Sequence, residues 1–397
     1  MQNQKGLFVL NVKDDYLETL EHTINTQSSA GESRVLQIWN EILENIADET
    51  KVSIEKTNDF HPMVQYILEQ MTKGEKPFSF YYDGDFNDNI WSFLCERTNI
   101  RVERPIRINL SYVLNEEFVN YERDSERSDL YIHNLLRLIS QIPAFDVEIY
   151  EAKEKKSIAL FSYEDVVNGI GFCEKDRLDG LYFCLNDKLG ELSLQELHES
   201  FSRRKKAMSV KEKFTDFIDV LKNREEQIPA YVYLPHIYLY MGSQELKEKM
   251  YRENAIDRTE YEIWSLFHFF MNNEKVQDAR FIIASKALSD AFEHGFVKVH
   301  GSVMQLEKYK NYFLEDIDQL SKKFVRTKTL VLDSGKSANV EIPNVMIYSE
   351  PKHTFLIRTN VNKIYSLSRV ANEVINEELA KAFYHYFDSI YSKNISL

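Results

Sequence analysis

The stretch from Val340 to Tyr391 decides the fold. It opens with Val-Glu-Ile-Pro-Asn-Val-Met-Ile-Tyr at 340–348, turns at Ser-Glu-Pro-Lys at 349–352 and returns as Thr-Phe-Leu-Ile-Arg-Thr at 354–359. Two short β-prone runs that flank a polar, proline-containing turn predict a β-hairpin. An asparagine-containing connection, 360–362, follows the hairpin and leads towards a helix.

That helix closes the stretch and has one apolar face. Apolar residues recur at the spacing of a 3.6-residue period, at Leu379, Ala382, Phe383, Tyr386, Phe387 and Ile390. Asn376 is the predicted N-cap, and Glu377 and Glu378 place negative charge in the first turn, where the helix dipole favours it. The pattern predicts a helix that packs on a sheet through this face.

Composition limits the protein class. The chain has 397 residues, 43% of them hydrophobic and 28% charged, which fits two domains of ordinary size. A formal net charge of −14 repels phosphate backbones, so we expect no direct nucleic-acid binding by this chain. The three cysteines, Cys95, Cys173 and Cys184, have no zinc-ligand spacing and fit a reducing cytoplasm. No apolar run approaches the ~18 residues of a membrane span, so we expect a cytoplasmic protein without membrane contact.

The two halves of the chain present similar elements in the same order. We match the predicted strands and helices in five pairs: 78–82 with 281–284, 130–138 with 312–320, 145–150 with 344–348, 158–162 with 355–359, and 194–201 with 379–387. A period of half the chain indicates a duplicated domain. We therefore predict a first half over 1–205, a charged helical linker over 206–224 and a second half over 225–397. The basic run in and before this linker is more simply a solvated face than a nucleic-acid contact.

A duplicated α/β unit with a hairpin, an Asn-containing loop and a final aromatic helix resembles the phospholipase D superfamily. The resemblance implies an α/β fold of two phospholipase-D-like halves, each a mixed sheet flanked by helices. That family carries a His-x-Lys pattern in each half, and this sequence contains none. Where histidine and lysine should fall, the halves have Asp146 and Glu148, and Asn344 and Met346. The chain thus resembles a non-catalytic relative, similar to the effector-sensing domain of some bacterial helix-turn-helix transcription regulators.

Two predicted strand-to-helix junctions are the candidate ligand contacts. Asp83-Gly-Asp85 follows one strand, and Ser285-Lys286 follows another. A turn with helix capping explains the first more simply, and capping explains the second equally well. If the halves are duplicated, these junctions share one cleft with Asp146, Glu148, Asn344 and Met346 beneath them. Such a cleft suits a cationic or amide-bearing small molecule or peptide.

Three functions remain open. We expect first a non-enzymatic ligand sensor in a bacterial transcription-control system, acting as a homodimer and without a metal or cofactor. The second is a protein-interaction or phage-related factor that uses the fold as a scaffold. The third, and the least favoured, is a phosphodiesterase with unorthodox catalytic residues, since that chemistry needs a histidine nucleophile and phosphate-holding lysines.

Overall fold

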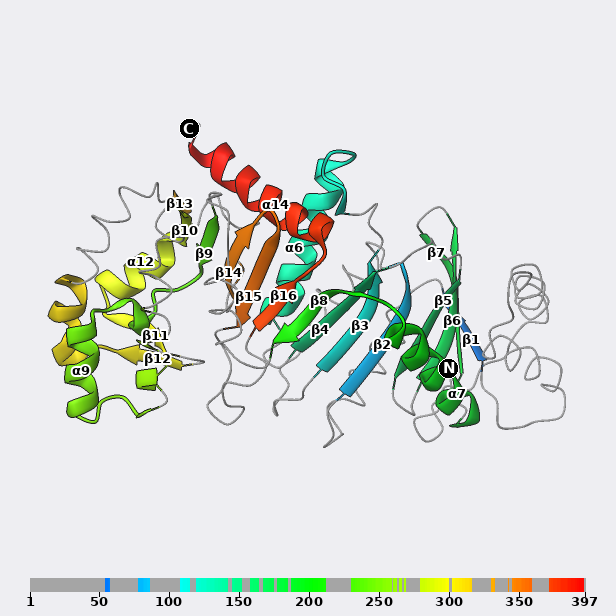
Figure 1. The fold of residues 1–397 in the computed structure, drawn as a ribbon, viewed down its shortest axis with the longest axis horizontal. Helices are drawn as coiled ribbons and strands as arrows, with labels where there is room; N and C mark the ends of the chain where they lie inside the picture. The colour runs from blue at the N-terminus through cyan, green and yellow to red at the C-terminus, as the bar shows by residue number, and fades with distance from the viewer. Residues whose placement is uncertain are drawn as a thin grey trace. The chain divides into compact units, whose positions relative to one another are not determined.

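The chain forms two compact units in the computed structural model (Figure 1). Unit 1 comprises residues 1–116 and 144–207, and unit 2 comprises residues 117–143 and 208–397. The structure describes residues 54–57, 78–85, 108–114, 119–141, 145–151, 158–163, 167–174, 177–184, 187–211, 230–258, 260–262, 264–265, 268, 279–299, 302–315, 330–332, 342, 345–358 and 371–395. Apolar patterns in the sequence predict a strand over 7–12 and helices over 32–47, 61–71 and around 90–94, and these elements lie outside the described ranges, as does Asn344.

Unit 1 contains one mixed sheet in the order β1-β7-β6-β5-β2-β3-β4. Its strands are β1 (Ile54–Thr57), β2 (Phe78–Asp85), β3 (Ile108–Leu114), β4 (Phe145–Glu151), β5 (Ile158–Tyr163), β6 (Val167–Glu174) and β7 (Arg177–Cys184). Strands β2, β3 and β4 are parallel, whereas β5, β6, β7 and β1 pair antiparallel. Helix α7 (Asp187–Ser202) follows the last antiparallel strand and contacts β2, β5 and β6.

Unit 2 contains a sheet in the order β8-β16-β15-β14-β9-β10-β13. Its strands are β8 (Lys206–Lys211, paired from Met208), β9 (Tyr231–Leu234), β10 (Arg280–Ala284), β13 (Leu330–Leu332), β14 (Val345–Glu350), β15 (His353–Arg358) and β16 (Ala371–Val374). Strands β9, β10 and β13 are parallel, and the others pair antiparallel. The remaining elements are η1 (Leu239–Met241), α9 (Gln244–Arg252), α12 (Ser285–Phe292), β11 (Phe296–Val299), β12 (Ser302–Gln305), η2 (Glu307–Tyr309) and α14 (Glu377–Ile395).

The two sheets have the same strand order and directions. Each sheet contains three parallel strands. The first of these along the chain, β2 or β9, pairs antiparallel with the strand that follows the three, β5 or β14. A helix follows in both units, α7 or α14. This order equates β2 with β9, β4 with β13 and β5 with β14. Three of our five predicted matches, those of 78–82, 145–150 and 158–162, are therefore displaced by one strand, because short apolar strands of similar composition do not fix their own place in a repeat.

Helix α14 forms as the apolar pattern predicts. Leu379, Phe383 and Phe387 are fully buried, and the helix contacts β14, β15, β16, β9 and β13 (Figure 1). The Asn376 side chain accepts a hydrogen bond from the backbone N–H of Leu379 at 3.0 Å, which confirms the predicted N-cap. The preceding hairpin, β14 and β15, is also confirmed, with Glu350 paired to His353 around a turn at Pro351 and Lys352.

Helix α6 (Ser125–Gln141) lies between β3 and β4 in the sequence but belongs to unit 2. It packs on α14 and β14. The His133 ring nitrogen Nδ1 lies 3.1 Å from the Tyr386 hydroxyl, and the Tyr121 ring stacks on His385 at 4.5 Å between centroids. From the sequence we predicted a single division of the chain near residue 205. The assignment of residues 117–143 to unit 2 departs from that prediction.

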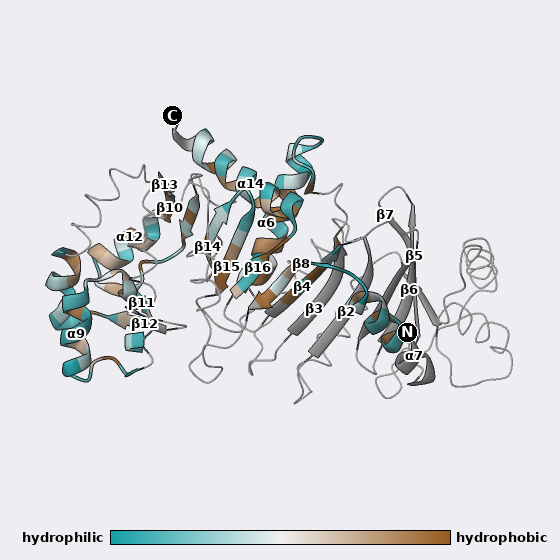
Figure 2. Ribbon diagram, in the orientation of Figure 1, coloured by the Kyte–Doolittle hydropathy of each residue, from teal (hydrophilic) through white to brown (hydrophobic). Residues whose placement is uncertain are grey.

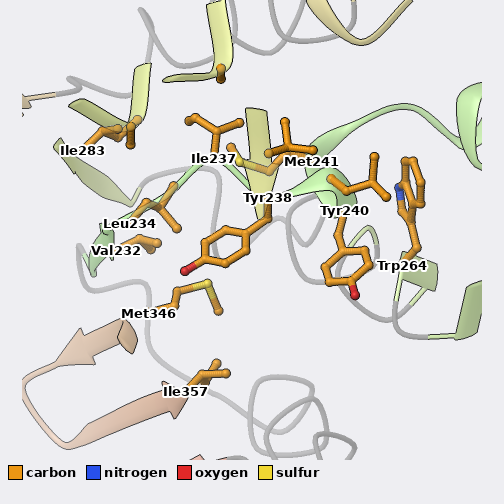
Figure 3. Packing of buried hydrophobic residues seen from close by; sticks show 14 of the residues in the cluster. Val232, Leu234, Ile237, Tyr238, Tyr240, Met241, Trp264, Ile283, Met346 and Ile357 are labelled. Atoms are coloured by element: carbon orange, nitrogen blue, oxygen red, sulfur yellow. The ribbon is translucent and has the colours of Figure 1, made fainter. Parts of the chain in front are cut away.

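The core of unit 2 is rich in aromatic side chains (Figure 3). Trp264 is fully buried, and its indole N–H donates to the Gly242 carbonyl at 3.1 Å. Figure 2 shows hydrophobic residues along β15 and hydrophilic residues along much of α9, which buries only one face. Tyr238, Met346 and Ile357 belong to the same buried cluster. Met346, which we predicted beneath a ligand-binding cleft, is thus a core residue with 2% exposure.

Three predicted elements differ from the structure. The tyrosine-rich run 230–241, which its β-prone residues predict as one strand, forms the short strand β9 and then η1, because Pro235 cannot continue a hydrogen-bonded ladder. The predicted strand 297–303 is a hairpin, β11 and β12, that turns between Val299 and Ser302. Residues 206–211, predicted as part of a helical linker, form strand β8, whose residues 208–211 pair with β16.

Candidate functional site

The carboxyl ends of β9 and β10 bring three polar groups of unit 2 together. The strands are parallel with Leu234 opposite Ile283, so the residues that follow each strand leave the sheet at the same edge. His236 follows β9, and Ser285 and Lys286 open α12 directly after β10. Ligands of open α/β sheets gather at such edges, and we name this set, together with Lys298, the carboxyl-edge cluster.

Lys298 reaches the cluster from β11. Its backbone N–H donates to the Ile237 carbonyl at 2.8 Å, and Lys298 forms an isolated parallel bridge with Tyr238. These contacts hold β11 beside the segment that leaves β9. Lys298 and Lys286, with Asp290 one helical turn further along α12, all act electrostatically on His236.

His236 is held neutral at this edge. Burial, with Lys298 nearby, lowers the pKa of His236 to about 4, while Asp290 opposes the shift. Its Nε2 atom is buried and has no hydrogen-bond partner among the residues that the structure describes. Buried polar atoms are nearly always hydrogen-bonded, so this unpaired Nε2 atom is an exception within the described residues.

The Lys298 ammonium is half-buried and similarly incomplete. Burial lowers its pKa, and within the described part of the chain no hydrogen bond or ion pair reaches its Nζ. Lys247, a buried lysine of the same unit, has partners for its ammonium group. It is 2% exposed, donates to Ser265 Oγ at 2.8 Å and lies 4.1 Å from the centre of the Tyr261 ring.

The start of α12 offers backbone donors. The N-cap is Ala284, no side chain caps the helix, and its first turn carries no acidic residue. The capping explanation of Ser285 therefore does not hold, since Ser285 is the first helical residue rather than the cap. The first-turn N–H groups point out of the helix without a side-chain acceptor at this end.

The opposite, amino edge of the same strands is a closed network. Arg280 and Tyr231 are partners in register, and Arg280 Nη1 donates to the Tyr231 hydroxyl at 2.5 Å and to Asp388 at 3.4 Å. The Tyr231 hydroxyl also donates to Asp388. Burial and this hydrogen bond raise the pKa of Tyr231. These groups satisfy one another and fix α14 on the sheet.

The predicted site residues of unit 1 have other surroundings. Asp83 and Asp85 lie within β2, whose strand extends to Asp85 with a register shift after Tyr82, and not in the loop that we predicted. Asp146 lies in β4 opposite Asn109. Glu148 accepts from Lys206 Nζ at 2.5 Å and from the Tyr150 hydroxyl at 2.7 Å, so both of its carboxylate oxygens are engaged.

The basic run after α7 is paired with acids of unit 1. Arg203 pairs with Glu199 at 3.3 Å, Lys205 with Glu151 at 3.2 Å and Lys206 with Glu148. Such pairing agrees with a solvated, neutralised face rather than a phosphate-binding one.

The eight predicted residues thus divide between the units. Unit 1 contains Asp83, Asp85, Asp146 and Glu148, and unit 2 contains Ser285, Lys286, Met346 and Asn344, the last of which lies outside the described residues. Sequence reasoning missed His236 and Lys298. His236 lies in a run that the sequence predicts as one strand, although Pro235 signals the end of that strand. Lys298 reaches the cluster only through its backbone hydrogen bond to Ile237, about sixty positions away in the sequence.

The described residues contain neither a metal-binding cluster nor a membrane-spanning helix. No group of three or more His, Cys, Asp or Glu side chains there could hold a metal ion. Among the helices that the structure describes, none is both long and apolar enough to cross a membrane.

Comparison with known proteins finds no matching family model and no matching curated protein. Three solved structures are similar over parts of the chain. The archaeal chromatin protein TrmBL2, with a novel mode of DNA binding, matches at 9% identity and a TM-score of 0.24, over 48% of this chain and 66% of that one. Polyphosphate kinase from Porphyromonas gingivalis matches at 9% identity and 0.25, over 88% of this chain and 50% of that one.

Phosphatidylserine synthase from Haemophilus influenzae matches at 10% identity and a TM-score of 0.25, over 86% of each chain. The kinase and the synthase have phospholipase D-like folds, the family that the sequence resembles. This chain spans half the length of the kinase. At these TM-scores the likeness carries no argument about function, and the phospholipase D resemblance stays a prediction.

Proposed function

We propose that this chain is a non-enzymatic, ligand-sensing module built from two related sheets and used in bacterial transcription control. The carboxyl-edge cluster is the observation that supports ligand binding, because it holds a buried imidazole nitrogen and a half-buried ammonium without partners among the described residues. The equal strand order of the two units supports duplication. The regulatory role itself rests on the resemblance to effector-sensing domains.

The rival scaffold function needs no such cluster. A chain that only displays a surface gains nothing from an unpaired, half-buried lysine, since a desolvated charge lowers stability. Proteins keep such costly groups at functional sites. The unpaired, half-buried Lys298 therefore favours a binding function over a purely structural one.

The phosphodiesterase alternative gains one observation, a neutral imidazole beside two lysines. That chemistry needs a second histidine as the acid, however, and His236 is the one histidine of the carboxyl-edge cluster. We therefore keep this activity as the least favoured function.

The test combines two measurements on the full chain. Thermal unfolding against a collection of small metabolites and short peptides should find compounds that raise the melting temperature in a saturable way. Hydrolysis of bis(p-nitrophenyl) phosphate should stay at the uncatalysed rate. Hydrolysis that disappears in His236→Gln would replace the proposal with the enzymatic alternative. The absence of any stabilising compound would favour the scaffold function.

A further inference from the structure

The charge balance of the carboxyl-edge cluster indicates what kind of ligand group it accepts. Lys286 and Lys298 each carry one positive charge, and Asp290 carries one negative charge within reach of the same histidine. His236 is neutral at physiological pH. The cluster therefore has a net charge of about +1, in a chain whose formal net charge is −14.

We propose that the carboxyl-edge cluster of unit 2 binds a carboxylate group of the ligand, held by Lys298, Lys286 and the first-turn N–H groups of α12. This inference rests on the ligand-binding function proposed above and names the chemical class that the site recognises. It differs from the cationic or amide-bearing ligand that the sequence suggested, because two lysines and one aspartate are the charged groups that act on His236.

A monoanion fits this site better than a phosphate. A carboxylate neutralises the net charge of the cluster, whereas a phosphate dianion exceeds it and meets repulsion from Asp290. A carboxylate also has two acceptor oxygens, and these match one ammonium and one helix terminus.

Each group has a distinct task. Lys298 supplies the strongest contact, because a half-buried ammonium is poorly screened by water. Lys286 is exposed and contributes less. His236, with its proton on Nε2, donates a hydrogen bond to the carboxylate without adding charge.

The experiment uses sodium acetate as a probe for the carboxylate, with sodium chloride at equal ionic strength as the reference. We expect acetate to raise the melting temperature of the full chain in a saturable way and chloride to leave it unchanged. Lys298→Met should weaken the fitted acetate affinity about tenfold or more, as for loss of a charge-assisted hydrogen bond. Lys286→Met should weaken it less.

Lys310→Met is the matched control. Lys310 Nζ donates to the Glu293 carbonyl, at the C-terminal end of α12, so its removal takes away one lysine charge but leaves the cluster intact. Without acetate, Lys298→Met should melt at a higher temperature than the parent, because an unpaired half-buried charge is replaced by an apolar chain of similar shape. If Lys298 had a purely structural role, Lys298→Met would lower the melting temperature instead.

Small organic acids and peptide C-termini both present this group, and a second arm separates them. A short peptide with a free C-terminus is compared with its C-terminal amide. A strong preference for the free acid over both acetate and the amide identifies a peptide ligand, and equal binding of free acid and acetate identifies a small acid.

Several outcomes overturn the inference. Phosphate binding that depends on Lys298 while acetate has no effect would show that the anion class is wrong. Acetate binding that is unchanged in Lys298→Met would show that the site is wrong. If a compound from the metabolite and peptide collection stabilises the chain equally in parent and Lys298→Met, the sensing function stands and this site does not serve it.

Discussion

Units 1 and 2 share a strand order but differ in how completely Glu148 in unit 1 and Lys298 and His236 in unit 2 are paired. In unit 1, both oxygens of Glu148 are engaged by Lys206 and Tyr150. In unit 2, Lys298 and the Nε2 atom of His236 have no such partner within the described residues. The same strand order thus holds a fully paired carboxylate in unit 1 and, at the carboxyl edge of unit 2, polar groups without a described partner. The difference teaches that strand order alone does not determine where polar groups are left unpaired.

The largest expected effect tests whether the two sheets carry equivalent helices. Phe383→Ala on α14 and Phe201→Ala on α7 each remove a buried aromatic ring, with 0% and 4% exposure. We expect each to cost about 3–5 kcal/mol in the free energy of unfolding, measured by urea denaturation. Lys381→Ala, at an exposed position of α14, is the control. A cost below 1 kcal/mol for Phe201→Ala alone would mean that α7 is not packed as α14 is.

The next prediction tests where α6 belongs. Leu135 is fully buried and Leu130 is 46% exposed on the same helix. Leu135→Ala should cost about 2–5 kcal/mol, and Leu130→Ala less than about 0.5 kcal/mol. Amide hydrogen exchange should accelerate in α14 and β14 of the Leu135→Ala protein, while β6 and β7 stay protected. Equal acceleration in β6 and β7 would argue against the assignment of α6 to unit 2.

Local patterns predicted the parts of the fold whose causes lie nearby in the sequence. The cap at Asn376, the apolar face of α14 and the β14–β15 hairpin each depend on residues within about twelve positions of one another, and all three are confirmed. The packing of α6 in unit 2 depends on contacts with α14 more than 230 positions away. No periodicity within α6 encodes that partner, so the sequence could not predict it.

The candidate site was predicted only in part for the same reason. Ser285 and Lys286 directly follow an apolar strand, and this local pattern is sufficient to predict them as candidate ligand contacts. Lys298 joins them because β11 forms a hairpin and hydrogen-bonds to Ile237. The predicted single strand at 297–303 concealed that hairpin, and Met346 was misplaced because the repeat was matched one strand away from the observed order.

The third prediction uses the pH dependence of stability to test the surroundings of His236 in the carboxyl-edge cluster of unit 2. The pKa of His236 is about 4 in the folded chain and about 6.5 in an unfolded one. Between these values the unfolded state binds more protons, so stability falls as the pH is lowered. We expect a loss of up to about 2 kcal/mol between pH 7.5 and pH 5. Burial also lowers the pKa of His133, which adds to the loss.

Urea midpoints at several pH values measure this loss, and His236→Gln should remove most of it. If the slope with pH survives in His236→Gln and disappears in His133→Gln, the acid sensitivity lies at the α6–α14 contact instead.

The smallest effect separates the units most sharply, because the sign differs. Glu148→Gln removes a partly exposed ion pair from unit 1 and should lower the free energy of unfolding by about 0.5–1 kcal/mol. Lys298→Met in unit 2 should raise it by a similar amount. Thermal unfolding of both variants in chloride buffer measures the pair. Destabilisation by both substitutions would mean that Lys298 is as well satisfied as Glu148.

The placement of α6 also has a consequence for how the protein is made. A ribosome releases α6 long before α14, since 236 residues separate Gln141 from Glu377. At ~5–20 residues per second, the apolar face of α6 waits on the order of 10–50 s for its partner. During that interval the native contacts of α6 with α14 cannot form. Nascent chains of this protein should therefore be clients of chaperones that hold exposed helices, and slowed translation should reduce the yield of folded protein.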